Sequence, residues 1–182
     1  MQTTTLTTPD GPFSIVVGAV PGAAASGHPA DEAILASGWT ADTDALLALV
    51  HPTLRPDADL RSAGPGAGVL GEARDAVVAY YDGDHEAPGR VPVVQASGPF
   101  RTHAWDVLRE VKAGERLTYS EYAVRAGRPA AVRAAAGACA MNAAALFVPC
   151  HRILRTDGTL GGFRYGLPIK ERLLAREAPA PR

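Results

Sequence analysis

Hydrophobic and polar positions divide the first half of the chain into short segments of regular structure. Two apolar runs, Pro12–Val17 and Ala33–Ala36, are bounded by Gly, Pro or Asp, which predicts β-strands. Apolar residues recur at helical spacing over residues 43–50 and 69–81, so we predict helices there. The first half is therefore expected to be a loose α/β region.

Stretches rich in glycine and proline mark the breaks between elements and between domains. We expect loops over residues 21–30 and 62–68, and an interdomain connection over residues 86–98. A chain of 182 residues is long enough for two small domains. We therefore expect an N-terminal α/β supporting domain over residues 1–85 and a C-terminal domain over residues 99–182.

The second half carries a more regular helical pattern. Helices are predicted over residues 100–111, 118–126, 129–141 and 167–177. Pro129 suits the first turn of a helix, where no backbone donor is needed, and Leu146–Val148 is predicted to be a strand. Two helices joined by a tight Gly-Arg-Pro turn have the outline of a helix-turn-helix.

The helix predicted over residues 129–141 has an unusual composition for a helix that reads DNA. It is built almost entirely from Ala, Gly and Val, and Arg133 is its one charged side chain. Helices that read the major groove carry several long polar side chains. Taken alone, the composition favours a close-packed core helix. The functional alternative is a slim helix that approaches a narrow groove and inserts one arginine.

Charge is distributed unevenly along the chain. The whole chain has a net charge of −1, which by itself argues against a polyanion-binding protein. Residues 1–97, however, hold 4 Arg against 12 Asp and Glu, whereas residues 98–182 hold 14 Lys and Arg against 7 Asp and Glu. The first part is therefore −8 and the second +7, a pattern expected when one part handles nucleic acid. The alternative is that the charges on solvent-exposed faces are unevenly distributed by chance and have no functional meaning.

Composition excludes several classes of protein. With 47% hydrophobic residues the chain can bury a core, yet no apolar run approaches the length of a membrane span. Met1 to Asp10 does not have the pattern of a secretory signal. Cys139 and Cys150 are too few for a disulfide framework and lack the spacing of a zinc site. We therefore expect a cytoplasmic protein, with no membrane partner.

Cys150 has neighbours that bear on its reactivity. A thiolate is the nucleophilic form of cysteine, and an adjacent base or cation favours it. His151 and Arg152 follow Cys150 directly, and Pro149 restricts the backbone before it. On a regular strand His151 would point away from the sulfur, so it could reach Cys150 only on a bent backbone or through a water. A buried, inert cysteine beside a surface histidine is the alternative.

A resemblance to a known family decides between these alternatives. The run from Phe100 to Glu177 resembles the catalytic domain of the O6-alkylguanine-DNA alkyltransferases. The motifs that carry the resemblance keep the order and spacing of the family: Phe100 with Trp105, Thr118-Tyr119-Ser120, Gly127-Arg128-Pro129, Val132-Arg133-Ala134, Asn142, Pro149-Cys150-His151-Arg152, Gly162-Phe163, and Lys170 with Leu173, Leu174 and Glu177. The resemblance implies a ribonuclease-H-like N-terminal α/β domain and a mainly α C-terminal domain with a helix-turn-helix.

The resemblance also implies a reaction. It makes Cys150 the acceptor of the O6-alkyl group of alkylguanine in DNA, transferred irreversibly, once per protein molecule, after the base is rotated out. Glu177 would orient His151, which would act on Cys150 through a water. Tyr119 would help to rotate the nucleotide and donate to the guanine ring, and Asn142 would tie the helix-turn-helix to the active-site loop. O4-alkylthymine remains open as a second substrate.

The expected partner is double-stranded DNA, approached from the minor groove. Arg133 matches the family's arginine finger, which fills the place that the base leaves. The other residues expected to contact DNA are Tyr119, Ser120, Arg128, Ala134 and Gly137. We expect a monomer associated with the nucleoid.

The carbonyls of Cys150 and Ile153 are expected to accept from the guanine amino group, and Phe163 and Arg164 belong to the loop that would wall the pocket. Two residues depart from the family pattern: Ala143 stands where a proline is frequent, and Phe163 where a tyrosine is frequent. Residues 1–97 contain no cysteine, so we expect no metal in that domain, and no cofactor.

Three other functions compete with this hypothesis. A non-catalytic relative that only binds alkylated bases would lack the cysteine of this motif, and Cys150 is present. A transcription regulator would use the helix-turn-helix, but the metal–thiolate domain of the adaptive-response proteins is missing. A Cys-His hydrolase would need an oxyanion hole, for which the sequence shows no pattern.

Overall fold

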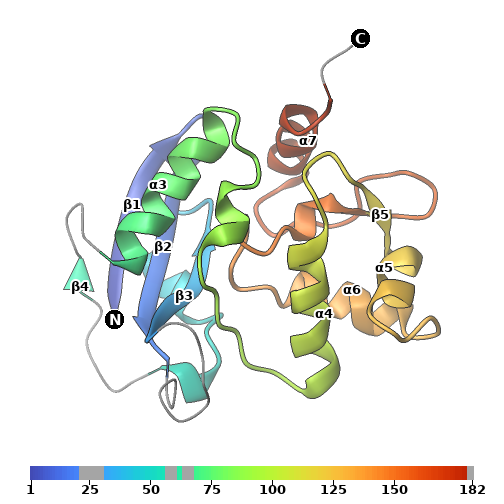
Figure 1. Cartoon of the computed structure of the whole chain (residues 1–182), viewed down its shortest axis with the longest axis horizontal. Coiled ribbons are helices and arrows are strands. Elements are labelled where there is room, and N and C mark those ends of the chain that lie inside the picture. Colours follow the sequence, from blue (N-terminus) through green and yellow to red (C-terminus); the bar gives the residue numbers. More distant parts are fainter. Residues whose placement is uncertain (21–30, 56–60, 63–67, 180–182) are drawn as a thin grey trace. The chain divides into compact units, whose positions relative to one another are not determined.

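The computed structural model describes residues 1–20, 31–55, 61–62 and 68–179. It divides into two compact units (Figure 1). The first comprises Met1–Ala96 together with Ala143–Phe147, and the second comprises Ser97–Asn142 together with Val148–Arg182. The loop expected over residues 21–30 and most of the loop expected over residues 62–68 lie outside the described residues.

A four-stranded sheet forms the frame of the first unit. Its strands are β1 (Gln2–Thr8), β2 (Gly11–Ala19), β3 (Glu32–Gly38) and β4 (Arg61–Ser62), and their order in the sheet is β3-β2-β1-β4. Strand β2 pairs antiparallel with both β1 and β3, whereas β4 pairs parallel with β1. The two strands predicted from apolar runs correspond to β2 and β3, which are buried along nearly their whole length.

The pattern of apolar residues missed strand β1. This strand is rich in threonine, a β-branched residue that suits a pleated and half-buried surface. A tight turn joins it to β2, where the Thr8 hydroxyl donates to the Gly11 carbonyl at 2.7 Å. Gly11 has a φ of +106°, a conformation that favours glycine.

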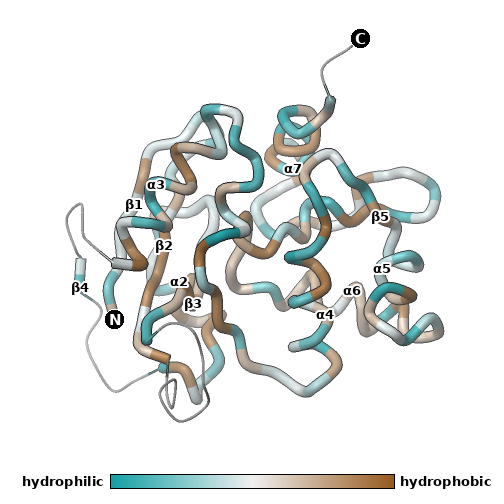
Figure 2. Tube along the Cα trace, in the orientation of Figure 1, coloured by the Kyte–Doolittle hydropathy of each residue, from teal (hydrophilic) through white to brown (hydrophobic). Residues whose placement is uncertain are grey.

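Helix α3 (Val69–Tyr81) packs on this sheet and has the bounds that its periodicity predicts. Its buried residues recur at helical spacing: Leu70, Ala73, Ala76, Val77 and Tyr80. Brown apolar segments alternate with teal polar ones along its trace (Figure 2). Helix α2 (Thr43–Leu47) is shorter than predicted, although the Asp42 side chain caps it by accepting from the Ala45 amide.

The outer edge of β3 is covered by two segments from elsewhere in the chain. The amide of Ile34 donates to Pro92, and the amide of Val94 donates to Ile34. Farther along, the Ser37 amide donates to Ala143, and the Ala145 amide donates to Ser37. Most of the segment expected to be a connection over residues 86–98 therefore belongs to the first unit, including the 3₁₀ turn η2 (Ala87–Arg90).

The prediction of a strand over Leu146–Val148 is wrong. Leu146 and Phe147 form a turn, and Leu146 has a φ of +73°. Phe147 is fully buried and lies 6.4 Å from Phe13 between ring centroids. The apolar composition of the segment therefore reflects burial in the first unit, not an extended ladder.

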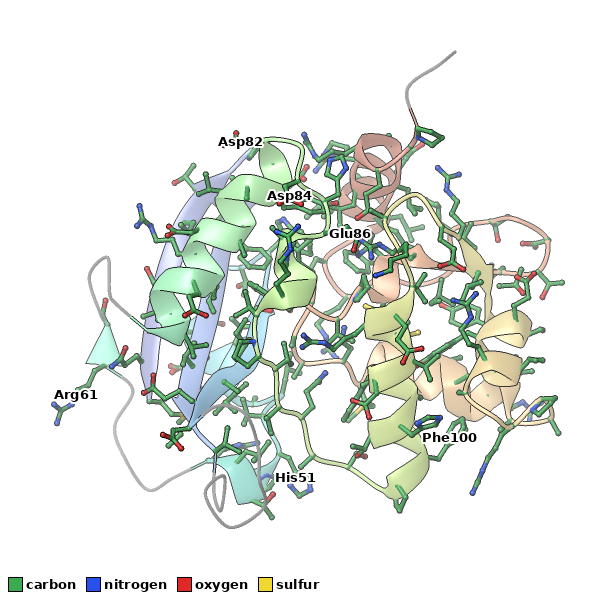
Figure 3. The ribbon with its side chains drawn as sticks, viewed as in Figure 1. His51, Arg61, Asp82, Asp84, Glu86 and Phe100 are labelled. Carbon is green, nitrogen blue, oxygen red and sulfur yellow. The ribbon has the colours of Figure 1, made fainter. Side chains whose placement is uncertain are left out.

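The first unit carries most of the acidic residues. Asp82, Asp84 and Glu86 follow the end of α3 (Figure 3). The Arg90 guanidinium makes two hydrogen bonds to the Asp84 carboxylate, at 2.7 and 3.0 Å. Because this pair is largely exposed, it contributes little to stability.

Four α-helices, one 3₁₀ turn and a short parallel strand pair build the described part of the second unit. They are α4 (Pro99–Glu110), β5 (Leu117–Thr118), α5 (Tyr119–Arg125), α6 (Val132–Ala140), the 3₁₀ turn η3 (Cys150–Arg152), β6 (Ile153–Leu154) and α7 (Leu167–Arg176). The four predicted helices are all present. Helix α6 begins at Val132 with Ala131 as its N-cap, so Pro129 lies before it and not in its first turn.

Local sequence explains how these helices begin and how they pack. Thr118 and Glu121 form a capping box that starts α5. The Trp105 indole of α4 donates to the Ala138 carbonyl of α6 at 2.9 Å, and the Tyr122 hydroxyl of α5 donates to the Ala104 carbonyl at 2.7 Å. Both bonds are buried, so they fix the three helices to one another. Within the described part of the chain, no helix is long and apolar enough to cross a membrane.

Tyr81 provides a test of how the first unit is held together. Its hydroxyl accepts from the Trp39 indole at 2.9 Å and donates to the Asp10 carboxylate at 2.9 Å. Burial raises the pKa of Tyr81 to about 12, so the hydroxyl stays protonated. Tyr81→Phe removes both bonds. We expect it to lower the free energy of unfolding by about 1–3 kcal/mol in urea denaturation.

Val78→Ala is the matched control for this prediction, because Val78 lies on the same helix and is 47% exposed. We expect it to change the free energy of unfolding by about 0.5 kcal/mol or less. Equal effects of the two substitutions would contradict the role assigned to the Tyr81 hydroxyl.

Candidate active site

Cys150 lies in a tight turn of the second unit. Residues Cys150–Arg152 form η3, in which the Arg152 amide donates to the Pro149 carbonyl at 3.0 Å. The residues of this turn are buried: Cys150 is 8% exposed, His151 0% and Arg152 4%. The backbone is therefore bent at Cys150. On a regular strand His151 would point away from the sulfur, but on this turn that objection does not apply.

A buried ionic network stands beside this turn. His151 Nε2 lies 2.8 Å from Glu177 Oε1, and Arg152 donates to both oxygens of the same carboxylate at 2.9 Å. Arg152 also donates to the Val111 carbonyl at 2.6 Å. Glu177 follows the last residue of α7, so the network joins that helix to η3 and to the end of α4.

The network sets the charge of its members. Burial opposes ionisation of Glu177, but His151 and Arg152 outweigh it and hold the pKa of the carboxyl below its ordinary value. Burial lowers the pKa of His151 by more than the nearby carboxylate raises it. The pair is therefore a carboxylate beside a neutral imidazole at neutral pH.

This arrangement fixes the tautomer of His151. A carboxylate can only accept, so Nε2 carries the ring proton and Nδ1 holds a lone pair. Nδ1 is buried and has no hydrogen-bond partner among the described residues. In the same part of the chain, no direct hydrogen bond joins His151 to Cys150. Nδ1 is thus an available base.

The sulfur of Cys150 is held by Asn142. The side-chain amide of Asn142 donates to Sγ at 3.2 Å and to the Val148 carbonyl at 2.8 Å. Burial raises the pKa of Cys150 by more than Asn142, Lys170 and Arg164 lower it. Cys150 is therefore a thiol at neutral pH and needs a base to become a nucleophile.

Tyr119 begins α5 and lies close to the loop after β6. A Cβ added to Gly161 would stand 3.1 Å from the Tyr119 hydroxyl and 3.2 Å from its ring, so a side chain at this position would crowd Tyr119. Gly161 also has a φ of +68°. Burial, with the thiols Cys139 and Cys150 nearby, raises the pKa of Tyr119 to about 12. Its hydroxyl is therefore a proton donor at neutral pH.

Lys170 is a site residue to which the sequence analysis gave no role. It is fully buried in α7, and its ammonium donates to the Ile153 carbonyl at 2.6 Å and to the Leu160 carbonyl. Burial lowers its pKa. The Ile153 carbonyl, which was expected to accept from guanine, already has this donor. Lys170 lies seven residues before Glu177 and on the same helical face, and this spacing is the sequence signal that indicates its burial.

The residues expected to contact DNA are more accessible. Arg128, Arg133 and Ala134 are exposed, whereas Ser120 and Gly137 are half-buried. Arg133 and Ala134 lie in the first turns of α6, whose residues Ala135 and Ala138 are fully buried. One face of α6 therefore packs in the core, as its small residues indicate. Arg133 lies on the other face and is exposed to solvent.

The loop before α7 carries the two residues expected at the pocket wall. The Arg164 guanidinium donates to the Ala140 carbonyl at the end of α6, at 2.5 Å. Phe163 packs edge-to-face on Tyr165, with ring centroids 5.8 Å apart. The sequence analysis gave Tyr165 no role. Among the described residues, no group of three or more His, Cys, Asp and Glu side chains could hold a metal.

Known proteins resemble this chain in sequence and in fold. A family model described as 6-O-methylguanine DNA methyltransferase, DNA binding domain, matches residues 99–179. The methylated-DNA–protein-cysteine methyltransferase of Haemophilus influenzae is 40% identical over 109 residues, which cover 60% of this chain and 61% of that protein. The bifunctional transcriptional activator/DNA repair enzyme Ada of Escherichia coli is 43% identical over 93 residues, covering 51% of this chain and 26% of that protein.

The matched segments thus span less than two thirds of either relative. Among solved structures, a variant of the M. tuberculosis O6-methylguanine methyltransferase is similar with a TM-score of 0.70 and 25% identity. That similarity covers 99% of this chain and 96% of the other. Residues 99–179 of this chain thus match the DNA-binding domain of the 6-O-methylguanine DNA methyltransferases, and the fold is similar to that of the M. tuberculosis protein.

Proposed function

We propose that the protein repairs DNA directly, by moving the O6-alkyl group of alkylguanine to Cys150. The observation that carries the proposal is the buried turn in which Asn142 holds the Cys150 sulfur, next to a neutral histidine whose other nitrogen is bonded to Glu177. The names of the relatives in Haemophilus influenzae and Escherichia coli support the same reaction.

The proton of the thiol leaves first in this mechanism. With Nε2–H donated to Glu177, His151 Nδ1 accepts a proton through a water that bridges it to Sγ. The imidazolium that forms is stabilised by the Glu177 carboxylate, as in a catalytic triad. Because Glu177 is also held by Arg152, the ring cannot turn away from this geometry.

Displacement at the alkyl carbon follows. The S–C bond forms as the C–O6 bond breaks, and the electron pair of the broken bond stays on guanine. Tyr119, protonated because burial raises its pKa, donates to the guanine ring and stabilises that charge. The product thioether has no route back to a thiol, so each protein molecule acts once.

Access to the alkyl carbon requires that the base leave the helix. We propose that α5 and α6 form a helix-turn-helix that approaches the minor groove, with Arg133 entering the stack and Ser120, Arg128, Ala134 and Gly137 along the backbone. The exposure of Arg133 and Ala134 supports this. The antiparallel β1–β3 sheet with a parallel β4 and a covering helix supports a ribonuclease-H-like first domain. We propose that the protein acts as a monomer.

The acceptor is tested by Cys150→Ala. We expect this substitution to abolish transfer of a methyl group from O6-methylguanine in duplex DNA, measured as a methyl increment in intact-protein mass. DNA binding should persist, because the neutral thiol makes no ionic contact with the DNA phosphates. Cys139→Ala, the other cysteine of the chain, is the control and should still be methylated. A methyl increment on the Cys150→Ala protein would refute the assignment.

Base rotation is tested by Arg133→Ala. We expect a much larger loss of transfer rate with duplex DNA than with an O6-alkylguanine free base, since only the duplex requires a base to leave the stack. Single-turnover rates on the two substrates give the comparison. Arg74→Ala, an arginine of α3, should leave the ratio of the two rates unchanged. Equal losses on both substrates after Arg133→Ala would contradict the finger role.

The pH dependence of the transfer tests His151 as the base. Nδ1 can accept a proton only while the ring is neutral, and burial lowers the pKa of His151. Activity should therefore persist as pH falls through 6.5, the ordinary histidine value, and be lost below it. The rate of transfer from the free base, measured against pH, shows this limb. A half-maximal rate above pH 6.5, or an unchanged limb in His151→Asn, would contradict the mechanism.

A further inference from the structure

A short buried segment, Ala143–Phe147, lies in the chain between Asn142 and Val148, and we call it the strap. Each of its residues is between 0 and 3% exposed. The strap belongs to the first unit, whereas Asn142 and Val148 belong to the second. These two flanking residues are joined directly, because the Asn142 side chain donates to the Val148 carbonyl at 2.8 Å. The strap is therefore a closed loop, and its neck contains the residue that holds the Cys150 sulfur.

Ser37 of β3 binds the body of the strap through three hydrogen bonds. Its amide donates to the Ala143 carbonyl at 2.9 Å, and its carbonyl accepts from the Ala145 amide at 3.1 Å. Both are backbone bonds, which most residue types could make. The third bond requires a hydroxyl: Ser37 Oγ donates to the Ala145 carbonyl at 2.8 Å, in a buried position. Without that hydroxyl, the buried Ala145 carbonyl would lose this donor.

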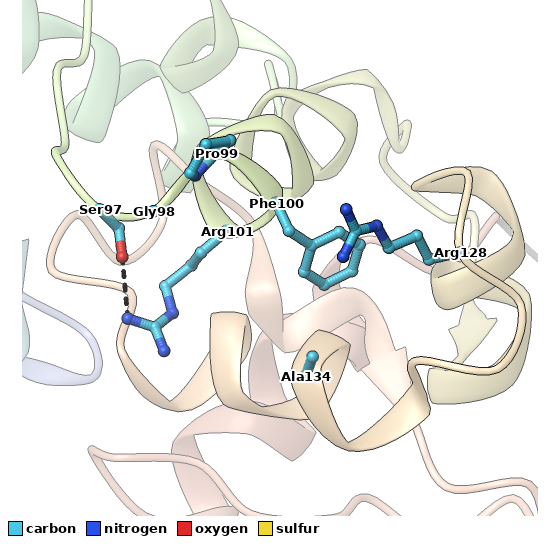
Figure 4. A pocket seen from close by; sticks show the side chains of 7 residues that line it. All are labelled: Ser97, Gly98, Pro99, Phe100, Arg101, Arg128 and Ala134. Carbon is cyan, nitrogen blue, oxygen red and sulfur yellow. Dashed lines mark hydrogen bonds between the residues drawn. The ribbon is translucent and has the colours of Figure 1, made fainter.

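Gln95 binds the beginning of the strap. Its side-chain oxygen accepts from the Ala143 amide at 2.7 Å. The chain is anchored before and after Gln95. The Val94 amide donates to the backbone of β3 at 3.0 Å, and the Ser97 hydroxyl accepts from the Arg101 guanidinium at 2.9 Å, the dashed line in Figure 4. The carboxamide of Gln95 is therefore a fixed acceptor for the strap.

The backbone of the strap is strained at Leu146. Its φ is +73°, and among the described residues Leu146 is the one non-glycine residue with a positive φ. A leucine adopts this conformation at a cost, and such residues persist where the surrounding structure fixes them. The burial of Phe147 near Phe13 and the bonds of Ser37 and Gln95 supply this constraint. The contacts of the strap therefore impose its conformation.

We propose that Ser37 and Gln95 are positioning residues for Cys150, because they fix the strap and thereby hold the Asn142 amide against the sulfur. The inference rests on the proposed function, in which Cys150 is the acceptor. Burial raises the pKa of Cys150, and the Asn142 hydrogen bond is the largest of the effects that lower it. A sulfur that becomes negative strengthens this bond, so a displaced amide would leave the thiolate less stable and less well aligned.

The reactivity of the thiol tests this role without DNA. Iodoacetamide alkylates the thiolate, and the mass of the peptide that contains Cys150 gives the rate of alkylation at each pH. Gln95→Leu removes the acceptor with little change of volume, and Ser37→Ala removes the hydroxyl. We expect each to slow alkylation of Cys150 at neutral pH by about three- to tenfold, because the pKa of the thiol rises. Gln95→Glu keeps an acceptor oxygen, so its rate should stay close to that of the unmodified protein.

Tyr81→Phe is the matched control. We expect it to destabilise the first unit through the loss of bonds to Trp39 and Asp10, which lie outside the strap. Its alkylation rate should equal that of the unmodified protein. Thermal unfolding of every variant is measured in parallel, and Gln95→Leu, at a half-buried position, decides the test if Ser37→Ala fails to fold. A rate for Gln95→Leu equal to that for Tyr81→Phe, or equal to a slowed rate for Gln95→Glu, would overturn the proposal.

Methyl transfer gives a second readout, which separates positioning from DNA contact. Transfer from duplex DNA and from an O6-alkylguanine free base should slow by the same factor in Gln95→Leu, since both reactions use the same thiol. A loss confined to duplex DNA would place Gln95 in DNA binding and overturn the proposal. If the unmodified protein takes no methyl group from either substrate, the proposed repair function fails, whereas the alkylation rates still decide the role of Ser37 and Gln95.

Discussion

The second unit depends on one buried ionic network, formed by Arg152, Glu177 and His151. Taking charged groups out of water is costly, and the cost is offset only where their hydrogen-bonding groups find partners. Arg152 meets this condition with the Glu177 carboxylate and the Val111 carbonyl. Removing either charged member would leave the other buried without compensation. The position of η3, and with it Cys150, is therefore tied to the end of α7.

The same network explains how a buried cysteine can be both stable and reactive. Burial keeps Cys150 protonated, which protects it from adventitious electrophiles while no substrate is present. The neutral His151, fixed in one tautomer by the carboxylate, supplies a base without placing a second charge in the core. In the proposed reaction, reactivity therefore waits for an aligned alkyl carbon. Such an arrangement suits the proposed reaction, in which each protein molecule acts once.

Sequence patterns predicted the helices well, because each buries one apolar face at a regular spacing, as the bounds of α3 show. The turn at Leu146 was mistaken for a strand, since apolar residues buried by distant contacts look the same in the sequence as those of a ladder. Motif spacing grouped Cys150 with its partners, but Lys170 received no role because a lysine in a helix is ordinarily solvated. A pattern of residue types cannot show that its ammonium reaches two backbone carbonyls in the fold.

Helix α6 shows how one sequence serves two demands at once. Ala135 and Ala138 are fully buried, and the Ala138 carbonyl accepts from the Trp105 indole of α4. Small side chains on that face let the two helices approach closely enough for this bond. On the open face, small side chains leave Arg133 as the one long group to project. Core packing and the proposed approach to DNA therefore do not compete for α6, because both favour small residues everywhere except at Arg133, the proposed finger.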